Sequence, residues 1–204
     1  MTIHLHKNDL PDDLHFKGAL AVDSETLGLN PLRDRLCVVQ LSSGDGSAHL
    51  VQFDGTDYSA PNLKAVLSDP KLAKIYHFAR FDLAALYQYL GIWAAPVFCT
   101  KIASKLTRTY TDRHGLKDLT RELISVDLSK QQQSSDWGAE VLSDAQMSYA
   151  ASDVLYLHQL MEILILRLKR ENRFEIANKA FEFLPTRAEL DLAGWAESDI
   201  FAHS

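Results

Sequence analysis

Residues 18–29 read Gly-Ala-Leu-Ala-Val-Asp-Ser-Glu-Thr-Leu-Gly-Leu, and this stretch decides the fold of the chain. Its apolar first half predicts a buried strand over 18–23. Asp23 and Glu25 stand two positions apart where that strand ends, and alternate residues of an extended segment point to the same side. Both carboxylates can therefore reach the same cation.

Two more carboxylates stand among apolar neighbours. They are Asp82 in His-Phe-Ala-Arg-Phe-Asp (77–82) and Asp153 in Tyr-Ala-Ala-Ser-Asp (149–153). Burying an unpaired carboxylate is expensive, so such groups normally come with hydrogen bonds, cationic partners or a metal. If the fold brings all four together, cations must neutralise them, and all-oxygen sites suit Mg²⁺ or Mn²⁺. The four carboxylates predict metal-assisted cleavage of a phosphodiester.

Each carboxylate also has a simpler interpretation when it is taken alone. Asp82 can cap a helix, Asp153 can be a buried hydrogen-bonding residue, and Asp23 can form a turn at the end of its strand. Tyr149 and Asp153 lie four positions apart on a predicted helix and share its surface. The order of all these residues, together with their neighbours, favours one shared site.

Composition indicates one soluble domain. The chain has 204 residues, of which 47% are hydrophobic, enough to bury a substantial core. No apolar run reaches the ~18–20 residues that span a bilayer. The amino terminus lacks the apolar region of a signal peptide, which predicts a cytoplasmic protein.

Cys37 and Cys99 lie in apolar segments and are predicted to be free, buried thiols. Two cysteines are too few for a disulfide framework or a zinc site.

The net charge of −6 is unevenly distributed along the chain. Residues 101–121 hold six cations against two acids, a local charge of +4 that leaves −10 for the remainder. A basic strip on an acidic body suits an enzyme that grips a few phosphates. The alternative is an ordinary solvated helix face.

The pattern of apolar residues and turn signals predicts an α/β domain. Strands are expected over 18–23, 34–42, 48–53, 74–78 and 97–99. Helices are expected over 61–67, 80–90, 100–107, 115–123, from Ser143 to about Lys169, and over 172–183, with a polar loop at 130–136. Ser143 and Gln146 form a capping box at the start of the long helix. Three antiparallel strands followed by alternating strands and helices imply a mixed sheet.

The motifs together resemble the DEDD exonuclease superfamily, in the tyrosine variant to which the ribonuclease D family belongs. Residues 23–29 match the first motif, residues 79–82 the second, and Tyr149 with Asp153 the third. The segments 100–106, 112–116 and 130–137 are similar to the short alphaproteobacterial nano-RNase C enzymes. The resemblance implies an RNase H-like fold, a mixed sheet of three antiparallel strands plus parallel strands flanked by helices. The exonuclease domain is expected over 1–184, and a tail over 185–204.

The resemblance also implies a site with two divalent cations, Mg²⁺ or Mn²⁺. Asp23 would bridge both cations, Glu25 and Asp153 would complete the site of the cation that carries the nucleophile, and Asp82 would assist directly or through a water. Tyr149 is expected to orient the attacking water, because a free tyrosine has a pKa near ~10 and is a weak base. The alternative role for Tyr149 is a core aromatic.

Contacts to substrate are expected around the first and second motifs. The backbone at Thr26 would meet the terminal hydroxyl, and Leu27 would wedge beside the base unless it belongs to the core. Phosphates or the 5′ side would meet His77, Arg80 and Lys130, although His77 is also typical of a strand residue with a satisfied hydrogen bond. Trp137 is equally consistent with a pocket wall and with packing. The second motif often has asparagine where Phe78 stands.

The resemblance implies a 3′-5′ exoribonuclease that hydrolyses dinucleotides or very short oligoribonucleotides to nucleoside 5′-monophosphates. The chain has no room for the C-terminal helical domains of ribonuclease D, which favours short substrates. The alternatives are an exonuclease acting on DNA 3′ ends and a catalytically silent RNA-binding scaffold. The resemblance implies a ring-like homo-octamer without membrane contact. Apolar residues near the end of the chain would either contact another subunit or cover a patch on their own subunit. They are Leu190, Leu192, Trp195, Ile200 and Phe201.

Overall fold

The computed structural model describes residues 1–203 and builds them around a six-stranded mixed sheet. The strands are β1 (Thr2–Lys7), β2 (Leu20–Thr26), β3 (Leu36–Ser42), β4 (Ser47–Gln52), β5 (Lys74–Tyr76) and β6 (Val97–Cys99), in the order β1-β4-β3-β2-β5-β6. Strands β2, β3 and β4 form an antiparallel meander, while β1 pairs with β4, β5 with β2 and β6 with β5 in parallel. The predicted mixed sheet is confirmed.

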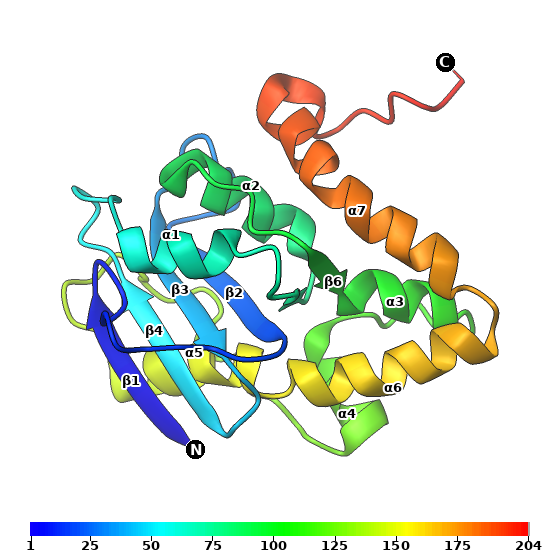
Figure 1. Cartoon of the computed structure of the whole chain (residues 1–204), viewed down its shortest axis with the longest axis horizontal. Helices are drawn as coiled ribbons and strands as arrows, with labels where there is room; N and C mark the ends of the chain where they lie inside the picture. The colour runs from blue at the N-terminus through cyan, green and yellow to red at the C-terminus, as the bar shows by residue number, and fades with distance from the viewer. Residues whose placement is uncertain (204) are drawn as a thin grey trace.

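Helices cover both faces of this sheet (Figure 1). They are α1 (Pro61–Ser68), α2 (Ala79–Leu90), α3 (Thr100–Thr107), α4 (Leu116–Ile124), α5 (Asp144–Leu155), α6 (Leu157–Arg170) and α7 (Phe174–Leu190), followed by the π-helical turn η1 (Asp191–Trp195). Helices α1 and α2 lie on one face and α5 lies on the other (Figure 1). This is the expected RNase H-like arrangement. Within residues 1–203, no helix has both the length and the apolar character that crossing a bilayer requires.

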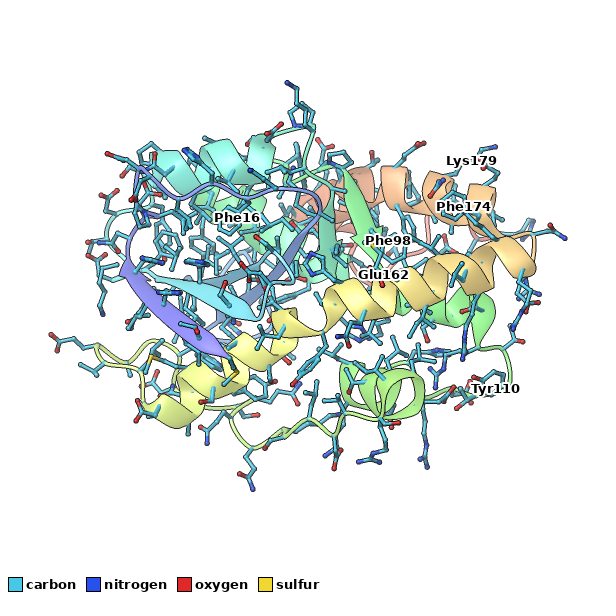
Figure 2. All side chains as sticks on the ribbon, turned by 60° about the horizontal axis from the view of Figure 1, so that its bottom comes forward. Phe16, Phe98, Tyr110, Glu162, Phe174 and Lys179 are labelled. Atoms are coloured by element: carbon cyan, nitrogen blue, oxygen red, sulfur yellow. The ribbon has the colours of Figure 1, made fainter. Side chains whose placement is uncertain are left out.

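The core explains why the central strands are nearly all apolar. Every residue of β3 is buried, because β3 has neighbours on both edges and helices over both faces. Farther along the sheet, Phe98 lies on β6 (Figure 2). Its ring centroid lies 4.9 Å from that of Phe181 on α7. Both cysteines are free and buried, as predicted.

The sequence pattern did not predict β1, and the C-terminal ends of β2 and β5 lie two or more residues from the predicted ends. β1 is a partly exposed edge strand, and edge strands tolerate polar residues that hide the apolar pattern. β2 runs to Thr26, beyond the predicted end at 23, so Asp23 and Glu25 lie inside the strand. β5 ends at Tyr76, short of the predicted 78, because Phe78 adopts a left-handed backbone and begins α2.

The single helix predicted from Ser143 to about Lys169 is two helices. The capping box of Ser143 and Gln146 is confirmed at the start of α5. The helix then breaks at Tyr156, where φ is −105° and ψ is −3°. Helix α5 packs on the sheet, whereas α6 packs on α3 and α4. The break lets the two halves bury different partners.

The predicted end of the last helix at residue 183 is wrong. Helix α7 continues through Pro185 to Leu190. An interior proline removes one backbone hydrogen bond and crowds the preceding turn, but the buried side chains of Phe181, Leu184 and Ala188 hold the helix on both sides of it. The division of the chain into 1–184 and 185–204 stays a prediction, and its boundary falls inside α7.

Candidate active site

Three of the predicted carboxylates converge between β2 and α5. Asp23 and Glu25 alternate along β2 and point to the face that α5 covers, and Asp153 lies on α5. One carboxylate oxygen from each of the three residues lies within 4.8 Å of the others. A register shift between Glu25 and Thr26 marks a bulge beside this cluster, and bulges commonly re-aim side chains next to active sites.

Asp82 lies next to the cluster, outside the group of three. It occupies the first turn of α2 and is almost fully buried. Ser24, which points to the opposite face of β2 from Asp23, donates a hydrogen bond from Oγ to Asp82 Oδ1 at 2.7 Å. Sequence reasoning did not single out Ser24, although its place between two candidate ligands was a signal.

The turn that presents Asp82 is strained. Phe78 has φ 73° and ψ 45°, a left-handed conformation that bulky residues rarely adopt. Its side chain is exposed, and Lys101 Nζ lies 4.1 Å from the centroid of its ring. Strain of this kind persists where the surrounding structure fixes it and is common at functional sites. Lys101 is a further basic residue near the site that sequence reasoning placed only in the basic strip.

Burial raises the pKa values of all four carboxylates, and repulsion between them adds to the shift of three. Burial raises the pKa of Asp23 to about 7. Burial, followed by the charges of Asp23, Asp153 and Asp82, raises the pKa of Glu25 to about 10. Burial and then the charge of Asp23 also raise the pKa values of Asp82 and Asp153 well above the ordinary range. A bound dication would have to displace these protons, so its affinity should rise with pH.

Tyr149 lies one turn before Asp153 on α5. Burial raises the pKa of its hydroxyl, and the charges of Asp153, Glu25 and Asp23 raise it further. The hydroxyl therefore stays protonated at neutral pH, where it can donate a hydrogen bond but cannot act as a base. Its ring centroid lies 6.0 Å from that of Trp137.

Leu27 directly follows β2, the strand that carries Asp23 and Glu25. Its side chain is 52% exposed, which excludes the alternative that it is a core residue. Thr26 is buried, and its Oγ1 donates a hydrogen bond to the carbonyl of Gly28. A Cβ on Gly138 would stand 2.7 Å from Leu27 Cδ2, so the 130–138 loop approaches the exposed side chain of Leu27 closely.

Trp137 belongs to a packed cluster. Its side chain is buried against α5 and the sheet, where the neighbouring buried residues are Cys37, Val38, Leu50, Leu142 and Ala150. Of the two interpretations left open by the sequence, this placement favours packing. The indole Nε1 has no hydrogen-bond partner within residues 1–203.

His77 and Lys130 lie in one basic neighbourhood. His77 Nδ1 lies 2.9 Å from Thr100 Oγ1, which matches the alternative of a satisfied histidine. Burial, followed by the nearby charges of Lys101 and Lys130, lowers the pKa of His77 to about 3. The imidazole is therefore neutral at physiological pH. Lys130 is exposed on its loop.

Arg80 contacts the C-terminal region of its own chain. Its guanidinium forms an ion pair with Asp191 and donates a hydrogen bond to the carbonyl of Ala196 at 2.8 Å. Arg187 contacts the same carboxylate, with 3.0 Å between nitrogen and oxygen. These contacts engage Nε and Nη2 of the guanidinium, and the contact of Arg80 with a phosphate stays a prediction.

Ion pairs within the chain neutralise part of the basic strip, residues 101–121. Arg108 is buried and forms an ion pair with Glu122, and Arg121 lies 2.7 Å from Asp127. Lys105 and Arg113 remain exposed. The strip is thus a mixture of structural ion pairs and free surface charge.

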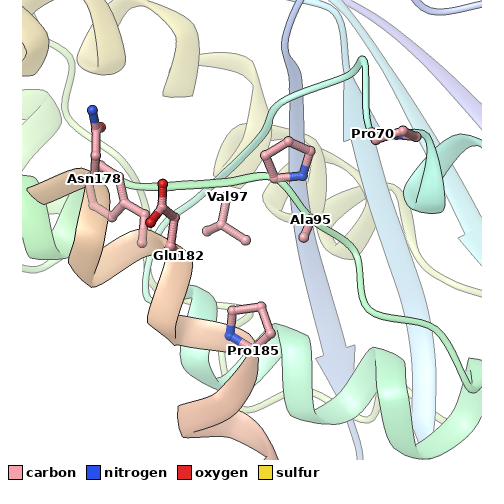
Figure 3. Close-up of a pocket in the computed structure, with 8 residues that line it drawn as sticks. Pro70, Ala95, Val97, Asn178, Glu182 and Pro185 are labelled. Atoms are coloured by element: carbon pink, nitrogen blue, oxygen red, sulfur yellow. The ribbon is translucent and has the colours of Figure 1, made fainter.

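Two hollows lie away from the carboxylates. One of about 510 Å³ lies between α7 and the segment that leads into β6 (Figure 3), and it is lined by Pro70, Ala95, Pro96, Val97, Asn178, Phe181, Glu182 and Pro185. Another of about 420 Å³ lies between Arg80 and the C-terminal residues. Within the described chain, neither hollow is lined by any of the four carboxylates.

The chain is similar to known exonucleases in sequence. Residues 6–169 match the family model described as 3′-5′ exonuclease. The ribonuclease D of Acidiphilium cryptum (strain JF-5) is 34% identical over 167 residues, which cover 81% of this chain and 42% of the relative. The chain spans about two fifths of the length of the curated ribonucleases D that it matches.

Two solved structures of Brucella melitensis NrnC match the whole chain. The structure bound to pGG is 61% identical with a TM-score of 0.96, and the match covers 100% of both chains. The structure with bound Mg²⁺ is 60% identical with a TM-score of 0.94, again over 100% of both chains. These matches relate the complete described fold, including α7, to known nucleases.

Proposed function

Because the chain belongs to the 3′-5′ exonuclease family that includes the ribonucleases D, we propose that it removes nucleotides from the 3′ end of very short RNA. The substrates are dinucleotides or very short oligoribonucleotides, and the products are nucleoside 5′-monophosphates. The observation that carries this proposal is the convergence of Asp23, Glu25 and Asp153 beside Tyr149. Similarity to a nuclease solved with pGG supports the choice of a short substrate.

The carboxylate cluster fits divalent cations. Its donors are all oxygens, as Mg²⁺ and Mn²⁺ prefer, and a similar nuclease was solved with Mg²⁺. Asp23, Glu25 and Asp153 would hold two such cations, with Asp82 assisting from α2. When bound, the cations would lower the pKa of the attacking water and stabilise charge on the leaving oxygen.

The side chains around the cluster position the reactants. The protonated hydroxyl of Tyr149 holds the attacking water in line with the scissile bond. The exposed side chain of Leu27 wedges against the terminal base, and the backbone at Thr26 meets the terminal hydroxyl. Lys130 and the neutral His77 would meet the 5′ side of a short substrate.

Substrate choice is tested by comparing four labelled substrates at equal concentration. We expect turnover to be fastest with a diribonucleotide, slower with a longer RNA, and slower again with single- and double-stranded DNA. A chelator should abolish every rate, because the carboxylates cannot replace the charge of a dication.

Each other outcome of this comparison selects a named alternative. Faster cleavage of DNA would favour an exonuclease of DNA 3′ ends, since phosphate coordination does not read the 2′-hydroxyl. Binding of RNA without hydrolysis of any substrate would favour a catalytically silent scaffold.

The C-terminal residues are proposed to join subunits in a homo-octamer. Trp195, Ile200 and Phe201 expose 47%, 47% and 75% of their surface, and the chain extends past α7 (Figure 1). Within the same chain, Phe201 packs edge-on against Phe183 at 6.0 Å between ring centroids. The tail therefore covers part of its own subunit and leaves apolar surface for another.

Substitution of the tail is expected to change the assembly. The double variant Ile200→Asp/Phe201→Asp should lower the mass measured by light scattering, because it places charge in an apolar contact. The control is Leu166→Asp, since Leu166 is 69% exposed on α6. An unchanged mass for the double variant would contradict the tail contact.

The proposed cytoplasmic location, which suits two free buried cysteines, is measurable by cell fractionation.

A further inference from the structure

A glutamine is buried directly beside the first carboxylate. Gln40 lies in the middle of β3, and none of its surface is exposed. In the antiparallel pairing of β2 with β3, its direct partner is Asp23. Residues that face each other across antiparallel strands point to the same side of the sheet. The side chain of Gln40 therefore lies on the face where the carboxylates converge.

The amide of Gln40 has no hydrogen-bond partner. Within residues 1–203, neither its nitrogen nor its oxygen finds one, although both atoms are buried. Gln52, on the neighbouring strand β4, is also buried but fully engaged. Its Nε2 donates to the carbonyl of Ala139 at 2.8 Å, and its Oε1 accepts from Lys7 Nζ at 2.7 Å. Of these two buried glutamines on adjacent strands, only Gln52 has hydrogen-bond partners within residues 1–203.

An unsatisfied amide in a strand core is costly, and an apolar side chain of the same size would avoid the cost. Opposed side chains on antiparallel strands have Cβ atoms about 4.5–5.5 Å apart. The two methylenes of a glutamine span that gap, so the amide can reach the carboxylate of Asp23. A ligating carboxylate is usually held by such a partner, and the partner orients it for the metal.

We propose that Gln40 is a positioning residue for the metal site, whose amide N–H donates to the carboxylate of Asp23 when Asp23 ligates a divalent cation. This inference rests on the proposed function, because it assumes that Asp23 is a ligand. Gln40 acts through Asp23 and does not touch the substrate. The amide is a neutral donor, so it orients the carboxylate without competing with the cation for charge.

The test compares Gln40→Met with the matched control Gln52→Met. Methionine is close to glutamine in length and volume but cannot donate a hydrogen bond. Thermal unfolding in chelator measures the fold, and calorimetric titration with Mg²⁺ measures the site. For Gln40→Met we expect an unfolding midpoint equal to or above wild type, together with a Kd for Mg²⁺ weakened by about 10- to 100-fold. For Gln52→Met we expect a lower midpoint and an unchanged Kd.

Further outcomes separate the positioning role of Gln40 from the existence of the metal site. Wild-type affinity for Mg²⁺ in Gln40→Met would overturn the positioning role while leaving the proposed function standing. A lower midpoint with unchanged affinity would assign Gln40 to the fold alone. A wild-type protein that binds no Mg²⁺ would overturn the proposed function and this inference with it. Gln40→Asn, which shortens the reach by one methylene, should weaken Mg²⁺ binding in the same way, so the role is tested even if the methionine variant does not fold.

Discussion

Replacing Asp153 by asparagine is expected to reduce hydrolysis of a diribonucleotide by about 10³-fold or more, because several kcal/mol of charge stabilisation disappear and each ~1.4 kcal/mol is tenfold in rate. Asp153 supplies one of the three carboxylates that converge within 4.8 Å. The asparagine side chain keeps the volume and removes the charge. The measurement is the initial rate over a titration of Mg²⁺, with circular dichroism to show that the fold is retained.

The matched control for this variant lies on the same helix. Asp144 is exposed in the first turn of α5, nine positions before Asp153, and Asp144→Asn should leave the rate within about twofold, as surface substitutions usually do. Near wild-type activity of Asp153→Asn at saturating Mg²⁺ would show that this carboxylate is not a ligand. The proposed cation site would then have two of these three carboxylates as ligands.

Replacing Tyr149 by phenylalanine is expected to lower kcat by roughly 10²- to 10⁴-fold, the usual contribution of a positioned proton-transfer group. The variant loses a hydroxyl that stays protonated beside Asp153 and keeps the ring that packs near Trp137. Affinity for Mg²⁺ should therefore be close to wild type. Single-turnover rates and a metal titration measure the two quantities separately.

A control tyrosine is available at the end of the same helix. Tyr156 lies at the break between α5 and α6, and Tyr156→Phe should leave kcat unchanged. If Tyr149→Phe lost its affinity for Mg²⁺ and regained its rate at high metal concentration, Tyr149 would be a support of the metal site. The assignment of Tyr149 to the attacking water would then be wrong.

The central strands and their connections were predictable because their signals are local. The apolar run before Asp23 marks β2, and the pair Ser143 and Gln146 marks the start of α5. The ends of elements were less predictable, since they depend on contacts made elsewhere. Helix α7 passes Pro185 because buried side chains on both sides hold it, and no residue near the proline announces that packing.

The site shows the same division between local and distant causes. The motifs predicted that Asp23, Glu25 and Asp153 meet, and the structure brings them together. The ion pair between Arg80 and Asp191 joins residues 111 positions apart, and a charged residue carries no sign of its distant partner. The sequence did contain a signal for Gln40, because a single glutamine within an apolar strand needs a hydrogen-bond partner.

The proposed function requires that the carboxylates of β2 and α5 hold divalent cations. The most direct measurement is anomalous X-ray diffraction from crystals grown with Mn²⁺. We predict anomalous peaks within about 2.0–2.4 Å of carboxylate oxygens of Asp23, Glu25 and Asp153, the range between Mg²⁺ and Ca²⁺ distances. Crystals saturated with Mn²⁺ that show no peak there, while the three carboxylates keep their positions, would contradict the claim.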